Sequence, residues 1–86
     1  MTQKSNRWSN LAMAQTDFPH DLLAAQTAWY AVYDQLAATT AGGAAHRRRL
    51  LELSRRITAH PFWQTPAGTP AARVALKELA RMQARP

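Results

Sequence analysis

Two interruptions in the chain constrain its fold more than any other feature of the sequence. Gly42-Gly43 favours a turn, because glycine readily adopts positive φ and weakens a helix that runs through it. Pro61 disfavours helical geometry at the residue before it, and Thr69-Pro70 is a typical cap and first position of a new helix. Apolar residues recur at helical spacing on both sides of these breaks. The sequence therefore predicts three helices, at about 18–40, 45–60 and 70–84.

Composition supports an all-α fold in a single domain. The chain has 86 residues, is rich in alanine and contains no cysteine, so we expect helices without a disulfide or a thiolate metal site. No apolar run approaches the ~20 residues of a membrane-spanning helix. We expect a compact three-helix bundle over residues 17–86, preceded by a flexible tail at 1–16, in a cytoplasmic protein.

The first predicted helix has an unusually wide apolar face. Asp17 is its expected cap, and apolar residues cover roughly half of its circumference, with Leu23 and Tyr30 on one flank. A small bundle usually needs a narrower stripe. This helix is therefore either the central one, contacting both others, or it keeps a second face for a partner.

The other two helices have narrower apolar sides, which suit packing against one neighbour. Together with the first helix and the second connection, they define the expected core. We predict that it contains Trp29, Tyr33, Leu36, Leu50, Leu53, Ile57, Phe62, Trp63, Leu76, Leu79 and Met82.

The connection between the second and third helices carries two large aromatic residues, Phe62 and Trp63. Because exposed aromatic rings in a loop are costly, we expect the pair to fold back and close one end of the core near Trp29 and Tyr33. The alternative is an aromatic hot spot for a partner.

Positive charge is concentrated in the second half of the chain. Nine of the eleven basic residues follow His46, against two glutamates there, and four of them recur every fourth residue on the third helix. Glu52 can pair with Arg48, Arg55 or Arg56 at helical spacing but cannot neutralise the whole second helix. The exposed basic faces predict a polyanion-binding surface made of Arg48, Arg49, Arg55, Arg56, Arg73, Lys77, Arg81 and Arg85.

Residues with catalytic or metal-binding potential are few. The three histidines fall on different elements, the five carboxylates form no convincing pair, and Ser54 has no neighbouring base along its helix. The glycines form no phosphate-binding loop. We therefore expect neither an enzyme nor a cofactor, metal or small-molecule substrate.

Two binding functions remain. The first is a binding or adaptor protein that contacts another protein or a second copy of itself through Leu23, Tyr30, Phe62 and Trp63. The second is an accessory protein that contacts the phosphate backbone of a nucleic acid through its basic faces. A helix-turn-helix is disfavoured by the long connection at 61–69, and aromatics are not interleaved with the basic residues as they are in single-strand binders. Membrane docking of the third helix ranks last, since its inner face is rich in alanine.

The stretch from Leu50 to Ala80, and especially Ala59-His60-Pro61-Phe62-Trp63 after the basic helix, resembles a group of small uncharacterised proteins from high-GC actinobacteria. Residues 21–26 and 75–77 are similar to segments of the same group. The resemblance implies a bacterial cytoplasmic setting. It implies no activity and no functional residue.

Overall fold

A computed structural model describes residues 18–85 of the chain. These residues form three α-helices and one short 3₁₀ helix, which confirms the predicted all-α class. The predicted tail at 1–16 and the predicted cap Asp17 lie outside the described residues. In chain order, the elements are α2 (His20–Ala38), α3 (Ala44–Thr58), η1 (Pro61–Gln64) and α4 (Pro70–Ala84).

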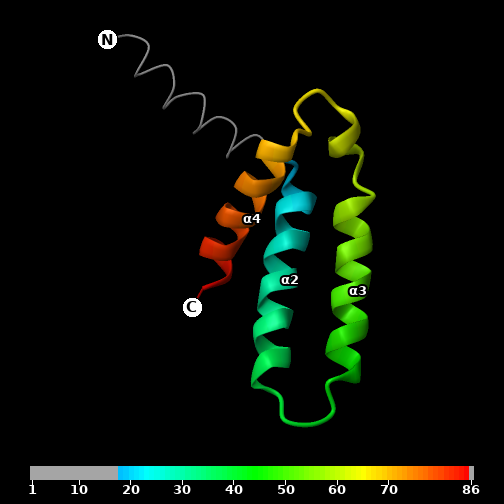
Figure 1. Cartoon of the computed structure of the whole chain (residues 1–86), viewed down its shortest axis with the longest axis vertical. Helices are drawn as coiled ribbons and strands as arrows, with labels where there is room; N and C mark the ends of the chain where they lie inside the picture. The colour runs from blue at the N-terminus through cyan, green and yellow to red at the C-terminus, as the bar shows by residue number, and fades with distance from the viewer. Residues whose placement is uncertain (1–17, 86) are drawn as a thin grey trace, which may run out of the picture.

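Helix α2 occupies the centre of the fold. The main helix-to-helix contacts join α2 to α3 on one side and α2 to α4 on the other. Figure 1 shows α3 running antiparallel to α2, while α4 runs in the same direction as α2 and leans away from it toward the C-terminal end. The wide apolar face of this helix is therefore used by two neighbours, as expected for a central helix.

Local sequence signals account for the ends of the helices. Gly42 adopts a φ of 73° in the turn before α3, a conformation that glycine accepts without strain. The Thr69 hydroxyl accepts a hydrogen bond from the backbone N–H of Ala72 at 3.1 Å, and Pro70 begins α4. At the start of α2, the Asp21 carboxylate accepts a hydrogen bond from the N–H of Leu22.

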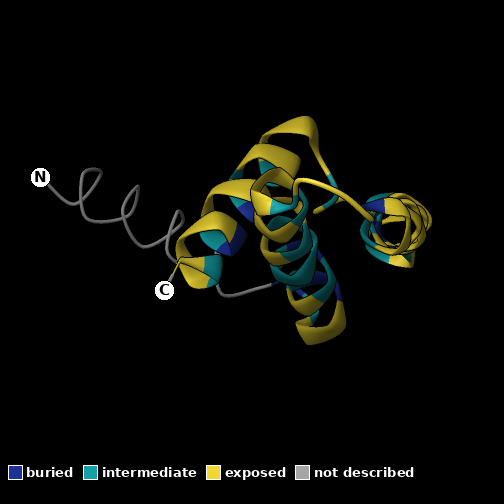
Figure 2. Ribbon diagram, turned by 90° about the horizontal axis from the view of Figure 1, so that it is seen from below, coloured by how far each residue is buried: buried dark blue, intermediate teal, exposed yellow. Residues whose placement is uncertain are grey.

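The core joins one leucine from each helix. Leu22, Leu53 and Leu76 are fully buried, and Phe18, Ile57 and Ala80 complete the buried apolar set. Figure 2 shows the buried residues on the sides where the helices face one another and the exposed residues on the outside. Leu53, Ile57 and Leu76 confirm the prediction. Six other predicted core residues are partly buried, namely Trp29, Leu36, Leu50, Phe62, Trp63 and Leu79.

Two predicted core residues are exposed instead. Tyr33 is 50% exposed and Met82 is 71% exposed, so the prediction was wrong for both. Ala80 takes the buried position on α4, and Met82 lies about 200° further around the helix, which turns its side chain toward solvent. Tyr33 lies in the second half of α2, where it lines a pocket shared with the C-terminal residues of α4 and stays open to solvent.

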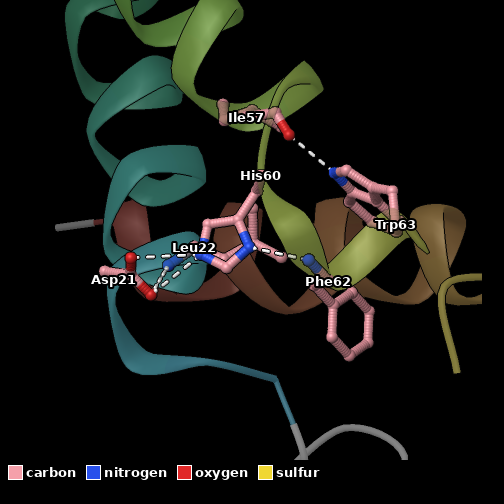
Figure 3. Close-up of polar contacts among 6 residues, drawn as sticks. All are labelled: Asp21, Leu22, Ile57, His60, Phe62 and Trp63. Atoms are coloured by element: carbon pink, nitrogen blue, oxygen red, sulfur yellow. Dashed lines mark hydrogen bonds and ion pairs between the residues drawn. The ribbon is translucent and has the colours of Figure 1, made fainter. Parts of the chain in front are cut away.

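The aromatic pair of η1 closes one end of the core, as predicted. The ring of Phe62 meets that of Phe18 edge-on, with centroids 5.6 Å apart. The indole N–H of Trp63 donates to the carbonyl of Ile57 at 2.6 Å (Figure 3). The ring partner is thus Phe18 rather than Trp29 or Tyr33. Phe18 lies two residues before the start of α2, and His60, which precedes η1, contacts Asp21 at that end of the helix.

Candidate functional site

Two pockets that share lining residues together form a groove along α2, on the side that α4 flanks. Its first part has a volume of about 230 Å³ and lies where all three helices meet. The second part, of about 410 Å³, lies between α2 and the C-terminal half of α4. The two parts share Trp29 and Tyr30. We call this surface the α2–α4 groove; it is lined by Gln26, Trp29, Tyr30, Tyr33, Asp34, Ser54, Ile57, Thr58, Arg73, Lys77, Arg81, Ala84 and Arg85.

The floor of the groove is aromatic. The rings of Trp29 and Tyr33 are stacked, with centroids 5.3 Å apart and planes within 12° of each other. Tyr30 meets Trp29 edge-on at 5.3 Å. The indole N–H of Trp29 donates to the Ser54 hydroxyl at 2.9 Å, which ties the floor to α3. This bond orients Trp29 and hence the ring stacked on it.

The wall of the groove on α4 is basic. Arg73, Lys77 and Arg81 recur every fourth residue of α4, which places successive Cα atoms about 6 Å apart along the helix axis, and Arg85 continues the spacing directly after the last helical residue, Ala84. The guanidinium of Arg73 lies 4.7 Å from the ring centre of Trp63, and the guanidinium of Arg81 lies 5.5 Å from the ring centre of Tyr30. Cation–π contact holds these two guanidinium groups beside aromatic rings while leaving their charge accessible.

The basic wall keeps its charge within the described part of the chain. All four of its residues are exposed, and none of them belongs to an ion pair between residues 18 and 85. The one acidic residue that lines the groove is Asp34, in the part that Arg85 also lines. The groove therefore combines an aromatic floor with net positive charge.

The predicted arginines of α3 do not line the groove. Glu52 accepts hydrogen bonds from Arg49 at 2.5 Å and from Arg56 at 3.0 Å. Arg56 was one of the predicted partners of Glu52, whereas Arg49 was not. Arg48 is exposed, and Arg55 lines a shallow apolar depression on α3, which shares Ser54 and Thr58 with the first part of the groove. The structure thus divides the eight predicted polyanion-binding residues into two sets, of which the α4 set adjoins aromatic rings.

Three of the four predicted protein-interface residues are engaged inside the fold. Leu23, Phe62 and Trp63 are partly buried and pack against the core cluster. Tyr30 lies in the groove under Arg81. The sequence analysis did not predict the aromatic floor. It assigned Trp29 and Tyr33 to the core, and it identified no aromatic residues interleaved with the basic ones. The helical spacing of Trp29, Tyr30 and Tyr33 could have indicated that these three rings gather on one side of the helix.

Reactive side chains are sparse in the groove. Ser54 accepts the Trp29 hydrogen bond, and no histidine lines either part of the groove. Among residues 18–85, no cluster of three or more histidine or acidic side chains is placed to hold a metal ion. In the same residues, no helix combines the length and the apolar character that crossing a bilayer requires.

Comparison with known proteins yields one match. The profile of a family described as a domain of unknown function, DUF8825, matches residues 21–79, which is more than half of the chain. Neither the curated proteins nor the solved structures include a match. The matched range contains the groove's aromatic floor and the first half of its basic wall.

Proposed function

The chain belongs to the DUF8825 family, and we propose that it is a non-catalytic protein that binds an anionic macromolecule through the α2–α4 groove. One observation carries the proposal: four basic residues at regular spacing border a groove whose floor is aromatic. The first part of the groove contributes Arg73 and Lys77, and the second contributes Arg81 and Arg85.

Electrostatics favours such a ligand. The chain carries a formal charge of +6 at neutral pH. A polyanion that lies against clustered Lys and Arg releases its condensed counterions, and this release drives association at low salt. The two arginines held over Trp63 and Tyr30 also lose less side-chain freedom on binding than unrestrained arginines would.

A non-catalytic role is supported by the chemistry of the groove. Among its hydroxyl groups, that of Ser54 already accepts a hydrogen bond from Trp29, and the one carboxylate that lines the groove, Asp34, lies in the other part. A nucleophile acts through a base within hydrogen-bond reach, and the hydrogen bond that Ser54 makes in the described structure is to Trp29. We propose a cytoplasmic location and an actinobacterial setting on the resemblance of residues 50–80.

Contact with another protein is the second candidate. It is favoured by the exposed apolar side chains of Leu51, Val74 and Met82, two of which lie on the outer side of α4. The residues first predicted to contact a protein partner give this candidate less support, because Leu23, Phe62 and Trp63 pack within the fold.

Retention on immobilised heparin and on single- and double-stranded DNA, at low and moderate salt, tests the principal proposal. The informative variant is Lys77→Ala with Arg85→Ala, because neither side chain forms a cation–π contact in the described structure. The matched control is Arg47→Ala with Arg48→Ala, which removes the same charge at the start of α3. We expect binding that weakens steeply with salt and is reduced far more by the groove variant than by the control.

Equal loss in both double variants, or no retention on any polyanion at low salt, would refute the groove as a polyanion site. Light scattering on the same samples addresses the second candidate. If the protein forms a salt-insensitive dimer and Val74→Asp or Met82→Asp dissociates it, protein contact through α4 is supported. If Tyr30→Asp or Leu23→Asp dissociates the dimer instead, the contact surface lies on α2.

A further inference from the structure

We infer that the ligand of the α2–α4 groove is a single-stranded nucleic acid, whose bases stack on the aromatic floor while its phosphates follow the basic wall. This inference rests on the proposed function and narrows its ligand to one chemical class. It also corrects the expectation that aromatic and basic residues lie apart in this protein.

The aromatic floor offers a surface for a base. Tyr33 is 50% exposed although it is stacked on Trp29, so it is the more exposed ring of an existing stack. A base that continues this stack replaces water on an aromatic face, an interaction that tolerates any base because every base has a π-face. The hydrogen bond from Trp29 to Ser54 keeps the platform in place before the ligand arrives.

The basic wall offers a path for the phosphates. Arg81 lies over Tyr30, and Arg85 lines the same part of the groove as Tyr33, so cations and aromatic rings border the same part of the groove. Lys77 and Arg73 continue the wall where the groove reaches α3. A positive groove with neighbouring aromatic rings is the arrangement by which sequence-tolerant proteins hold single strands.

Other polyanions would use only part of this site. A duplex keeps its bases stacked on one another, so its phosphates could reach the basic wall but its base faces could not reach Tyr33. An acidic peptide would pair its carboxylates with the wall and would leave the aromatic floor without a matching group. A free single strand can stack its bases on the aromatic floor and at the same time place its phosphates against the basic wall.

Fluorescence anisotropy with a labelled twelve-residue oligothymidine tests the inference, using full-length protein. The comparison probes are an abasic strand of equal length, a duplex of equal length and poly-glutamate as competitor. Tyr33→Leu removes the stacking face without changing charge, and Tyr33→Phe retains it. We expect Tyr33→Leu to weaken oligothymidine binding by at least about fivefold, the lower bound for loss of one base stack. Tyr33→Phe should stay within about twofold of the parent.

The abasic strand supplies an internal control, because it retains the phosphates alone. It should bind more weakly than oligothymidine, and Tyr33→Leu should leave its affinity unchanged. The Lys77→Ala and Arg85→Ala double variant should weaken both probes and reduce the slope of log K against log salt by about 1.4 for a single strand. Helical circular dichroism and thermal melting verify that each variant is folded.

The outcomes separate this inference from the proposed function. If every probe binds with a salt-dependent affinity that the groove charges control, but Tyr33→Leu has no effect on oligothymidine, the groove binds polyanions and the single-strand inference is wrong. Tighter binding of the duplex than of the single strand, or displacement of oligothymidine by poly-glutamate at equal charge, would also overturn it. Absence of binding to all probes overturns both.

Discussion

The imidazole Nε2 of His60 lies 3.1 Å from both carboxylate oxygens of Asp21. On its other side, the Nδ1 of His60 accepts a hydrogen bond from the N–H of Phe62 at 3.1 Å, which makes His60 the cap of η1. These two contacts assign the neutral tautomer with its proton on Nε2, which donates to Asp21 (Figure 3). One side chain thus links the first turn of α2 to the aromatic pair that closes the core.

Because of this link, the stability of the fold should depend on pH in the acid range. The hydrogen bond from His60 lowers the pKa of the Asp21 carboxyl below its usual value. A carboxyl whose pKa is lower in the folded state stabilises the fold above its unfolded pKa of about 4. That stabilisation is lost as the pH falls through the folded pKa. Asp21→Asn should therefore lower the melting temperature slightly at pH 7 and have no effect near pH 2, as measured by circular dichroism.

Glu78→Gln provides the matched control for this prediction. Glu78 is an exposed carboxylate on α4, and it forms no ion pair within residues 18–85. Its substitution should not change the difference in melting temperature between neutral and acid pH. An Asp21→Asn effect of the same size at both pH values would mean that the charge of Asp21 is not responsible.

Trp63 should contribute to stability through both its ring and its indole N–H. Because the ring is only partly buried, Trp63→Ala should cost about 2–3 kcal/mol, below the ~3–5 typical of fully buried large aromatics. Trp63→Phe keeps a ring but removes the donor to the Ile57 carbonyl, and it should cost about 0.5–1.5 kcal/mol. Urea unfolding measures both values. An unchanged midpoint for Trp63→Ala would show that the ring does not close the core.

Two glycines should respond to substitution for different reasons. A Cβ at Gly68 would lie 2.5 Å from the carbonyl oxygen of Phe62 and 2.6 Å from the Cα of Trp63, both backbone atoms that cannot turn aside. Gly68→Ala should therefore cost about 1–3 kcal/mol. At Gly42 the surroundings are open and only the φ of 73° is unfavourable to other residues.

Asparagine distinguishes the two cases, since it tolerates the left-handed conformation but still carries a Cβ. Gly42→Asn should be nearly as stable as the parent, whereas Gly68→Asn should be at least as unstable as Gly68→Ala. Thermal melting of these three variants and the parent is sufficient. Equal tolerance at both positions would argue against the close approach between Gly68 and η1.

The orientation of α4 can be tested with a buried and an exposed residue two positions apart. Leu76 has no exposed surface, so Leu76→Ala should destabilise the fold by about 2–5 kcal/mol. Val74 is 57% exposed, and Val74→Ala should change stability by less than about 0.5 kcal/mol. Chemical denaturation of both variants provides the measurement. Similar costs at the two positions would contradict the way α4 faces α2.

Much of the fold could be predicted because its signals are local. The turn at Gly42 needs only a residue that accepts positive φ, and the start of α4 at Thr69 needs only a hydroxyl and a following proline. Burial of Leu53 and Leu76 follows from apolar spacing along each helix. Predictions failed for Tyr33 and Met82, because periodicity identifies an apolar face but not how much of that face a neighbour covers.

The candidate site depended on long-range packing. Arg81 and Tyr30 are separated by fifty-one positions in the sequence, yet the guanidinium lies over the ring. Sequence spacing therefore suggested that basic and aromatic residues lie apart. The exposed row on α4 was visible in the sequence, but its proximity to the aromatic residues of α2 was not.

The sequence by itself determined three helices, their ends and the regular basic row of the third, since each depends on interactions within a few residues. Only the tertiary structure decided that α2 is central, that η1 packs on Phe18 and that the basic row borders an aromatic groove. These features depend on how helices far apart in the chain pack together, and a wide apolar face on α2 is compatible with more than one such arrangement.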